Sequence, residues 1–493
     1  MMLDNLQSMI PIIVLSFGVV VVLVVSAFRS SSLLNSTLAV GALGCAAVFI
    51  CGWDQPVLLF SNTLKLDAFA RIGALACVCA GIIACLPAAS YLKRTRIALH
   101  DEYFALVLAS VTGMVVMMAA NDLMVMFVNL EIMSIAMYIL CGINRFSTKS
   151  TESALKYFIN GAVSSAILLF GIAMLYGVFG TTNLDAIASQ ASSAHGSLLA
   201  LFGAACLLVG FLFKLGVFPF HMWVPDVYQG APTLVTGLMA AGIRIAAGVV
   251  LIRLFADVFA PLAPGWDRML WWIAAITMTI GNFSALVQNN VKRMLGYSSI
   301  AHAGYLMVAF VGLTSANFSG AEAAVYYLIA YSVASLGMLV VVGQIEGERE
   351  TFLEYDDYKG LGLRHPWAGV ALSIFLLSLT GIPPLAGFFG KLSLFSTAIK
   401  NGYTGLAVIG VLNSLVSAYF YFRLMVNMYM HKSAEVKPAA FIRTPMAFVT
   451  ILTCCFLTLW FGFGPFQIFG AIPSVDTLVN EIASAIGAVQ SRL

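Results

Sequence analysis

The chain has 493 residues, of which 61% are hydrophobic and only 10% are charged, and its formal net charge is +3. Soluble proteins carry roughly 25% charged residues and about 45–50% apolar ones, so this composition excludes a water-soluble globule and a soluble catalytic module. So small a net charge also excludes a phosphate-binding face, and with it nucleic-acid binding. The sequence therefore predicts a membrane protein.

Fourteen apolar runs are long enough to cross a bilayer, which takes a helix of about 20 residues. Lipid offers the backbone no hydrogen-bond partner, so each run is predicted to be a helix, and an even number places both termini on one side. No clear cleavage site follows the first run, which favours a retained helix over a signal peptide. The runs cover residues 10–28, 35–53, 69–92, 103–121, 123–143, 155–180, 198–218, 231–255, 269–290, 297–316, 322–345, 367–399, 403–430 and 445–468.

The connections between these runs differ in basic charge. Connections after odd-numbered helices hold fourteen Lys and Arg residues, and those after even-numbered helices hold four: Lys65, Arg71, Arg268 and Lys400. Basic residues stay in the cytoplasm, so this bias predicts cytoplasmic odd connections and both termini outside. In a bacterial cell such a protein is expected in the inner membrane, with periplasmic termini.

Two runs contain helix breakers at membrane depth. The run 367–399 is interrupted at residues 381–387 (GIPPLAG), and the stretch 198–232 carries Pro219, Pro225 and Pro232. Paired interrupted helices in two halves of a chain are typical of inverted repeats with a site at the breaks. Because Lys214 and Lys391 lie 177 residues apart, we expect two five-helix units, helices 4–8 and 9–13. The expected division is 1–100, 101–257, 258–432 and 433–493.

Little of the sequence is left for regions outside the membrane. Residues 54–68 favour a small outer hairpin, and residues 346–364 favour a short surface helix. Neither segment is large enough to house a cofactor domain. The nine cysteines form no Cys-x-x-Cys pair, which predicts small apolar side chains and not iron–sulfur or zinc ligands.

Several ionisable residues fall inside the predicted spans, where a charge costs at least about 2.5–3.5 kcal/mol. They are Glu131 in helix 5, Lys214 in helix 7, Arg244 in helix 8, His302 in helix 10, Lys391 in helix 12, and His221 at the helix 7 break. Burial and neighbouring charges tune proton affinity, and histidine exchanges protons near neutral pH, so such a row favours proton movement. Nearby serine and tyrosine hydroxyls favour bridging water.

Each of these residues also has a purely structural interpretation. Glu131 can bridge helices, the two lysines can extend to an interface, and both histidines can be hydrogen-bonded packing residues. Arg244 serves equally well as an ion-pair partner, because a guanidinium hardly deprotonates. Lys156, four residues after Glu152, most simply forms an ion pair with it at the cytoplasmic interface.

Four motifs resemble the antiporter-like subunits of respiratory complex I over residues 100–430, and subunit N most closely among them. They are residues 152–158 (ESALKYF), 214–232 (KLGVFPFHMWVPDVYQGAP), 292–305 (KRMLGYSSIAHAGY) and 381–391 (GIPPLAGFFGK). Lys391 stands where subunit M carries a glutamate, and the chain ends without the lateral helix of subunit L.

The resemblance implies an all-α membrane subunit of about fourteen helices that translocates protons. It implies that Glu131 is the helix 5 acid paired with Lys214, and that Lys391 exchanges protons with the outer side. It also places Lys156 at a second lysine position of the family. Arg244 departs from the usual lysine or histidine, so we expect a fixed charge there, with the proton passing through water.

The resemblance further implies that redox chemistry occurs in partner subunits. Flavin, iron–sulfur clusters and quinone are expected there, with subunits M and K as neighbours and the lateral helix of subunit L alongside. Two other interpretations remain open: a subunit of an Mrp-type cation/proton antiporter, and a structural bundle with inert buried charges. A hydrogenase-linked or ferredoxin-linked relative differs only in its electron donor.

Overall fold

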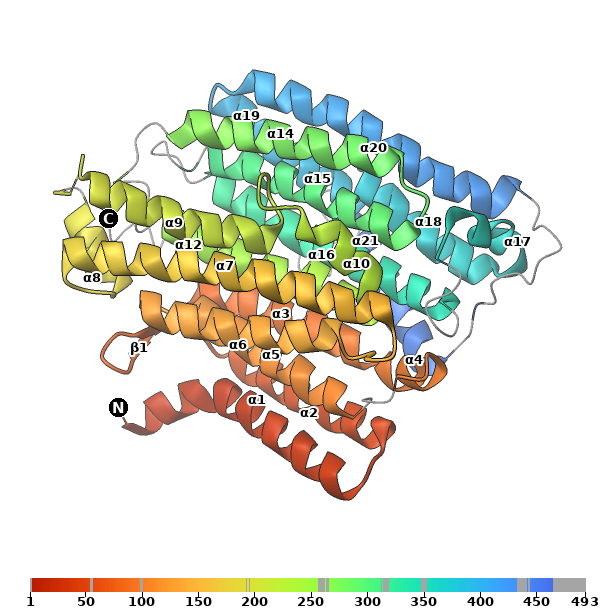
Figure 1. Cartoon of the computed structure of the whole chain (residues 1–493), viewed down its shortest axis with the longest axis horizontal. Coiled ribbons are helices and arrows are strands. Elements are labelled where there is room, and N and C mark those ends of the chain that lie inside the picture. The colour runs from red at the N-terminus through yellow and green to blue at the C-terminus, as the bar shows by residue number, and fades with distance from the viewer. Residues whose placement is uncertain are drawn as a thin grey trace.

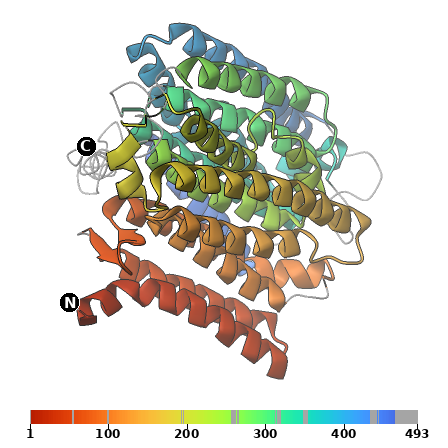
Figure 2. The same cartoon turned by 60° about the vertical axis from the view of Figure 1, so that its left-hand side comes forward.

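The structure is a computed structural model, and it describes residues 2–53, 56–97, 101–191, 193–194, 196–255, 262, 266–311, 313, 319–346, 353–431, 441 and 444–463. Within these residues, thirteen helices are long and apolar enough to cross a membrane, or fourteen if one bent pair counts as a span. Figure 1 shows them lying side by side as one bundle, and Figure 2 shows the same layering from a second direction. The chain is therefore the polytopic all-α membrane protein that the composition predicts.

The N-terminal helices come first. They are α1 (Met2–Phe28), α2 (Ser32–Ile50), α3 (Ala68–Cys85) and the short α4 (Ala88–Arg94). Of these, α1 and α2 lie at one edge of the bundle (Figure 1). The predicted run 69–92 is thus two helices, because Pro87 removes a backbone donor at the junction. The predicted outer hairpin is present, with β1 (Val57–Leu59) paired antiparallel to β2 (Leu64–Leu66).

The central helices follow in chain order. They are α5 (Glu102–Ala119), α6 (Leu123–Cys141), α7 (Thr148–Phe179), the short α8 (Leu184–Ala191), α9 (Leu198–Leu215), α10 (Trp223–Gly230), α11 (Thr233–Leu238), the π-helix η1 (Met239–Ile243) and α12 (Arg244–Leu254). The segment from α11 to α12 is one continuous span that is buried on all sides. It is the innermost helix of the described chain, since a helix apolar all round belongs in a core.

The second half of the bundle contains α14 (Trp266–Leu286), α15 (Val291–Val311), α16 (Ser319–Ile345), η4 (Tyr355–Tyr358), α17 (Leu361–Arg364), α18 (Pro366–Thr380), α19 (Ala386–Lys400), α20 (Thr404–Met430) and α21 (Pro445–Phe463). The predicted surface helix over 346–364 is replaced by the short η4 and α17, and its residues 347–352 lie outside the described part. Residues 464–493, which the predicted run 445–468 enters, also lie outside it.

Both predicted helix breaks are present. The first separates α9 from α10 at residues 216–222, and the second separates α18 from α19 at residues 381–385. Each begins with a glycine in the left-handed conformation, Gly216 at φ 72° and Gly381 at φ 91°, and each contains a cis proline, Pro219 and Pro384. Glycine adopts the left-handed backbone conformation without strain, and this conformation commonly terminates a helix. Both helices therefore end at these glycines.

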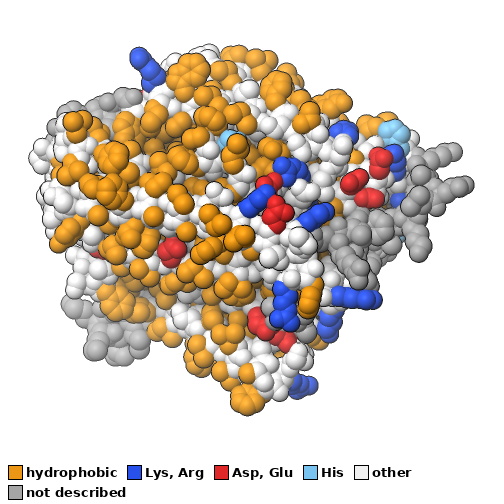
Figure 3. Space-filling model, in the orientation of Figure 1, with side chains coloured by type: hydrophobic (Ala, Val, Ile, Leu, Met, Phe, Trp, Pro, Cys, Tyr) orange, Lys and Arg blue, Asp and Glu red, His pale blue; other side chains and the backbone are white. Residues whose placement is uncertain are grey.

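Charged side chains gather toward one end of the bundle. Figure 3 shows most of the blue and red groups on this face near α4, α10 and α17, while orange apolar groups cover the rest. The end with α4 and α10 is the one that the basic connections of the sequence place in the cytoplasm.

Candidate functional site: a row of buried charges

The row begins on one face of α6. Glu131, Ser134 and Tyr138 follow one another at helical spacing, so they lie above one another on that face. The carboxylate of Glu131 accepts a hydrogen bond from Ser165 on α7. The amine of Lys214 donates to Ser134 Oγ at 2.7 Å and to Tyr138 Oη at 3.2 Å. Glu131 and Lys214 are thus on adjacent helices, and the lysine binds hydroxyls between them and not the carboxylate itself.

Lys214 is placed by the break in its helix. It lies in the last turn of α9, where a cation interacts favourably with the carbonyl end of the helix, and it is only 2% exposed. Its amine also lies 5.4 Å from the ring centre of Tyr138, 5.8 Å from that of Tyr157 and 5.5 Å from that of Phe213. Aromatic faces stabilise a cation that has left water, so this pocket can hold the charged form.

His221 lies within the first break and is buried. Its ring is 5.7 Å from that of Phe218, and its Nδ1 has no hydrogen-bond partner. An unpartnered buried nitrogen costs about 1–3 kcal/mol unless water reaches it.

Arg244 is the next charge and follows the π-helix η1 directly. It is 4% exposed, donates to Ser299 Oγ, and its guanidinium lies 5.1 Å from the ring centre of Tyr331. Ser299 in turn donates to Tyr228 Oη at 3.0 Å. Arg244 therefore has hydroxyl and aromatic partners, and among the ion pairs recorded for the described residues none involves it.

His302 connects Arg244 with the second half of the bundle. Its Nδ1 is 2.6 Å from Tyr327 Oη and its Nε2 is 3.2 Å from Tyr421 Oη. Its ring packs 4.8 Å from that of Tyr331, the same ring that faces Arg244, and 5.6 Å from that of Tyr305. Both ring nitrogens are partnered by phenols, so the imidazole can donate on one side and accept on the other.

Lys391 ends the row at the second break. Its amine donates to the carbonyl oxygens of Leu379 at 3.0 Å and Thr380 at 2.9 Å, which are the last carbonyls of α18. It also lies 4.7 Å above the ring of Tyr305. Lys214 precedes its break, whereas Lys391 follows its own, so the two lysines occupy different positions in the two broken helices.

Three of the candidate residues are linked through aromatic rings: Arg244 and His302 share the ring of Tyr331, and His302 and Lys391 share that of Tyr305. Lys214 lies two residues before Gly216, where a β-carbon would stand 4.0 Å from Arg244 Nη2. Such an arrangement holds several positive charges in a low-dielectric interior, where each strongly affects the next. Chemically it can bind, hold and pass protons between hydroxyls, amines and an imidazole.

Lys156 lies apart from this row. Its side chain is 41% exposed and forms ion pairs with Glu152 at 2.7 Å and with Asp226 at 2.6 Å. Asp226 also pairs with Arg293 at 2.6 Å. The pair with Glu152 that helical spacing predicts is present, within a surface network that joins α7, α10 and α15.

Three further charged groups are buried: Lys292 and Glu346 lie in predicted connections, and Arg253 lies near the end of the predicted run 231–255. Lys292 is fully buried and donates to Ala231 O at 2.6 Å, which stabilises the end of α10. Glu346 is buried beyond the end of α16. Arg253 forms a buried ion pair with Asp67 at 2.8 Å. Their positions in or beside charged connections gave no sign of burial, since only the packing of distant helices covers them.

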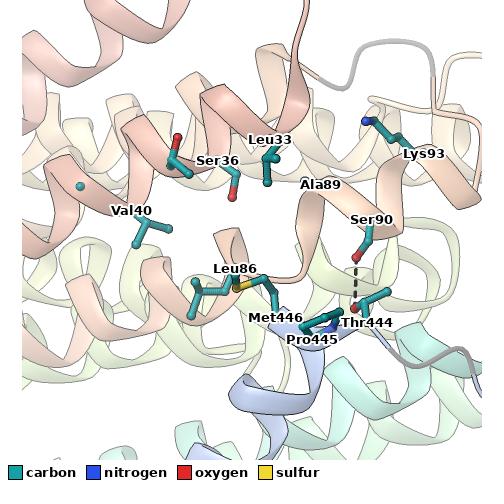
Figure 4. A pocket seen from close by; sticks show the side chains of 12 residues that line it. Leu33, Ser36, Val40, Leu86, Ala89, Ser90, Lys93, Thr444, Pro445 and Met446 are labelled. Carbon is teal, nitrogen blue, oxygen red and sulfur yellow. Dashed lines mark hydrogen bonds between the residues drawn. The ribbon is translucent and has the colours of Figure 1, made fainter.

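An apolar pocket lies away from the row, between α2, the α3–α4 junction and α21. It has a volume of about 530 Å³, and Figure 4 shows Leu33, Val40, Leu86 and Met446 around it. The hydrogen bond between Ser90 and Thr444 closes one side, at 3.3 Å. No group of His, Cys, Asp and Glu that could hold a metal occurs among the described residues.

Comparisons with known proteins place this geometry in a family. Residues 120–417 match the family described as NADH:quinone oxidoreductase/Mrp antiporter, transmembrane. The NADH-quinone oxidoreductase subunit N of Trichlorobacter lovleyi is 40% identical over 454 residues, which cover 91% of this chain and 92% of that protein. A chain of respiratory complex I from Thermus thermophilus is 28% identical, with a TM-score of 0.79 over 93% of this chain and 98% of that one.

A chain of the Mrp complex from Dietzia sp. superimposes with a TM-score of 0.83 over 99% of both chains. At 20% identity this likeness concerns the fold alone.

Proposed function

We infer the function of this chain from its membership, for it belongs to the family of NADH-quinone oxidoreductase subunit N, within the NADH:quinone oxidoreductase/Mrp antiporter family. We propose that it is a proton-translocating membrane subunit of an NADH:quinone oxidoreductase complex, assembled with other membrane subunits. It belongs to the translocase class and carries no redox group of its own. Flavin, iron–sulfur clusters and quinone are bound by partner subunits.

The observation that carries this proposal is the buried row from Lys214 to Lys391. Burying several cations in one interior is expensive, and a purely structural bundle would be more stable with apolar side chains there. The breaks release backbone carbonyls from helical hydrogen bonding, and at the second break two of them, on Leu379 and Thr380, accept from Lys391. Glu131 supplies the negative charge that balances Lys214 across the hydroxyls of α6.

Each residue of the row has a proposed role. Lys214 holds a proton at the first break and releases it when the balance with Glu131 changes. Arg244 is a fixed positive charge that biases its neighbours, because its guanidinium does not deprotonate. His302 passes protons between phenols, and His221 orders water in the break. Lys391 exchanges protons at the second break.

Lys156 stabilises the surface network around Asp226. We further propose that the units 101–257 and 258–432 are inverted repeats, supported by the two matched breaks, each of which begins with a glycine of positive φ. The unit 1–100 and the segment 433–493 flank them. The basic connections support a bacterial inner-membrane location with periplasmic termini. Subunits M and K are the proposed neighbours, with the lateral helix of subunit L alongside.

The test is proton pumping by the assembled complex with Glu131→Gln or Lys214→Ala. Both changes are expected to reduce pumping while NADH oxidation by the partner subunits continues. Lys149→Ala, an exposed lysine in the first turn of α7, is the matched control and is expected to pump normally. Normal pumping by the Glu131 and Lys214 variants would favour a structural bundle with inert charges.

The fold shared with the Mrp complex favours a second candidate, an Mrp-type cation/proton antiporter subunit. Purification in mild detergent distinguishes the two. A redox complex brings flavin and iron–sulfur absorbance with this chain, whereas an antiporter does not.

A further inference from the structure

Glu346 is a buried carboxylate that the row described above does not include. It follows the last residue of α16 and is 1% exposed. Its Oε2 accepts hydrogen bonds from Tyr91 Oη at 2.8 Å and from Thr233 Oγ1 at 2.6 Å. Its Oε1 is buried without a partner. A buried carboxylate with one oxygen unused is costly unless water or a proton satisfies it.

Other unpartnered polar atoms lie in the same region. Gln344 Nε2, Arg94 Nε and Tyr358 Oη are all buried and without hydrogen-bond partners. Arg94 donates to Gln344 Oε1 at 3.4 Å and to the carbonyl of Gly343 through its other nitrogens. Buried polar groups in native proteins rarely lack partners, so several in one place indicate internal water.

Within the described residues, the groups that face Glu346 come from four helical elements. Tyr91 and Arg94 are on α4, Thr233 begins α11, Gln344 is on α16, and Tyr358 is close enough on η4 to interact with it electrostatically. Arg94 is the charged group among them. The remaining neighbours are neutral hydroxyls and an amide, which can donate to a carboxylate or accept from a carboxylic acid.

Polar side chains continue from Glu346 toward Arg244. Thr233 is the first residue of the inner helix that carries Arg244 eleven residues later. Two residues before Thr233, Ala231 accepts the hydrogen bond from Lys292. Ser299 lies two turns beyond Lys292 on the same face of α15 and bonds both Tyr228 and Arg244. Polar groups therefore occur at intervals between Glu346 and Arg244.

We propose that Glu346 is the carboxylate at which this chain takes up protons from the cytoplasmic side. The proposal rests on the function and orientation proposed above. The ionised carboxylate accepts a proton from a hydronium ion in the adjoining water, giving a carboxylic acid and water. The acid then returns this proton to water beside Thr233 and Lys292, which regenerates the carboxylate and moves the proton inward.

The test uses the assembled complex with Glu346→Gln. Glutamine still accepts hydrogen bonds from Tyr91 and Thr233 but cannot carry a proton, so assembly and NADH oxidation are expected to persist while pumping is lost. Glu346→Asp keeps an acid and is expected to recover part of the pumping. Glu102→Gln is the matched control, because Glu102 is an exposed carboxylate near the same end, in the first turn of α5. Native pumping by Glu346→Gln would overturn the proposal.

Tyr91→Phe provides a second measurement if Glu346→Gln fails to assemble. It removes one hydrogen bond to the ionised carboxylate and leaves the acid in place, so the pH profile of pumping is expected to move upward. A residue with only a structural role would leave that profile unchanged, and an unchanged profile would overturn the proposal. If Glu131→Gln and Lys214→Ala also pump normally, the proposed function fails; if they do not, only the role of Glu346 fails.

Discussion

The guanidinium of Arg244 lies against the backbone of Gly216, since a β-carbon built on Gly216 would stand 4.0 Å from Arg244 Nη2. The second break repeats this relation, because a β-carbon on Gly381 would stand 3.6 Å from Lys391 Nζ. In both broken helices, a glycine with positive φ brings bare backbone beside a buried cation. Each break is thus in contact with one of the buried cations. A substitution at either glycine is therefore expected to displace the neighbouring charged side chain.

Gly216→Ala is expected to destabilise the first break. A left-handed residue other than glycine costs roughly 1–2 kcal/mol, and the added carbon would stand 2.7 Å from Val224 Cγ2. Thermal unfolding of the purified complex should therefore occur at lower temperature, with reduced pumping. Gly177→Ala is the control, because nothing lies within 4 Å of its β-carbon position in α7. Equal behaviour of the two variants would contradict the role given to Gly216.

Lys391→Met is expected to weaken the junction of α18 and α19. The carbonyls of Leu379 and Thr380 would lose a charged donor, and hydrogen bonds to charged groups contribute about 1.5–3 kcal/mol each. Both stability and pumping should fall. Lys400→Met, at the exposed end of the same helix, should change neither. Unfolding temperature and proton uptake, measured on the same preparation, check the prediction, and a stable but inactive Lys391→Met complex would limit the lysine to proton transfer.

The buried pair of Asp67 and Arg253 gives a prediction about stability alone. Arg253 Nη2 lies 2.8 and 2.9 Å from the two carboxylate oxygens. Asp67→Asn keeps the cap that Asp67 provides for Ala70 at the start of α3 but leaves a buried cation unpaired, which costs about 3–5 kcal/mol. Adding Arg253→Met should recover much of that loss. A double variant no more stable than Asp67→Asn would show that the two charges are not coupled.

The Asp185 carboxyl is expected to make the stability of the fold sensitive to acid. Partial burial alone would raise the pKa of this carboxyl, but hydrogen bonds from Asn121 and Lys65 and the charge of Lys65 lower it below its usual value of about 3.9. The carboxyl therefore stabilises the fold above that value and loses this contribution as the pH falls through its lower folded pKa. Thermal unfolding between pH 6 and about pH 3 should show an acid-induced loss that Asp185→Asn lacks. If the unfolding temperature of Asp185→Asn falls with pH as steeply as that of the unmodified protein, the prediction is wrong.

Much of the fold follows from the sequence because lipid leaves the backbone few choices. Long apolar runs must be helices, and the glycine and proline clusters mark both breaks within a few residues. The junction at Pro87 was missed, since hydropathy stays high across it. The segment 346–364 was expected to form a surface helix, and hydropathy alone could not show that α4 and α11 cover its first residue, Glu346.

The sequence singles out the residues of the candidate site but does not predict their contacts. An ionisable residue within an apolar run is visible in sequence, which identifies Glu131, Lys214 and Lys391. Their partners are not visible, because the hydroxyls of Ser134 and Tyr138 and the carbonyls of α18 come close only after packing. Lys292 was counted as a connection residue, and its burial depends on α10 folding over the start of α15.

The π-helix before Arg244 determines where that side chain points. Five residues, Met239–Ile243, complete a wider turn than an α-helix would, and Arg244 follows at once. Each residue of an α-helix advances the side chain by about 100° around the axis, so deleting one residue here would rotate Arg244 away from Ser299 and Tyr331. The extra residue of the π-helical turn thus sets the direction in which the Arg244 side chain points. Removing that residue would turn the guanidinium away from its partners without changing the charge of the protein.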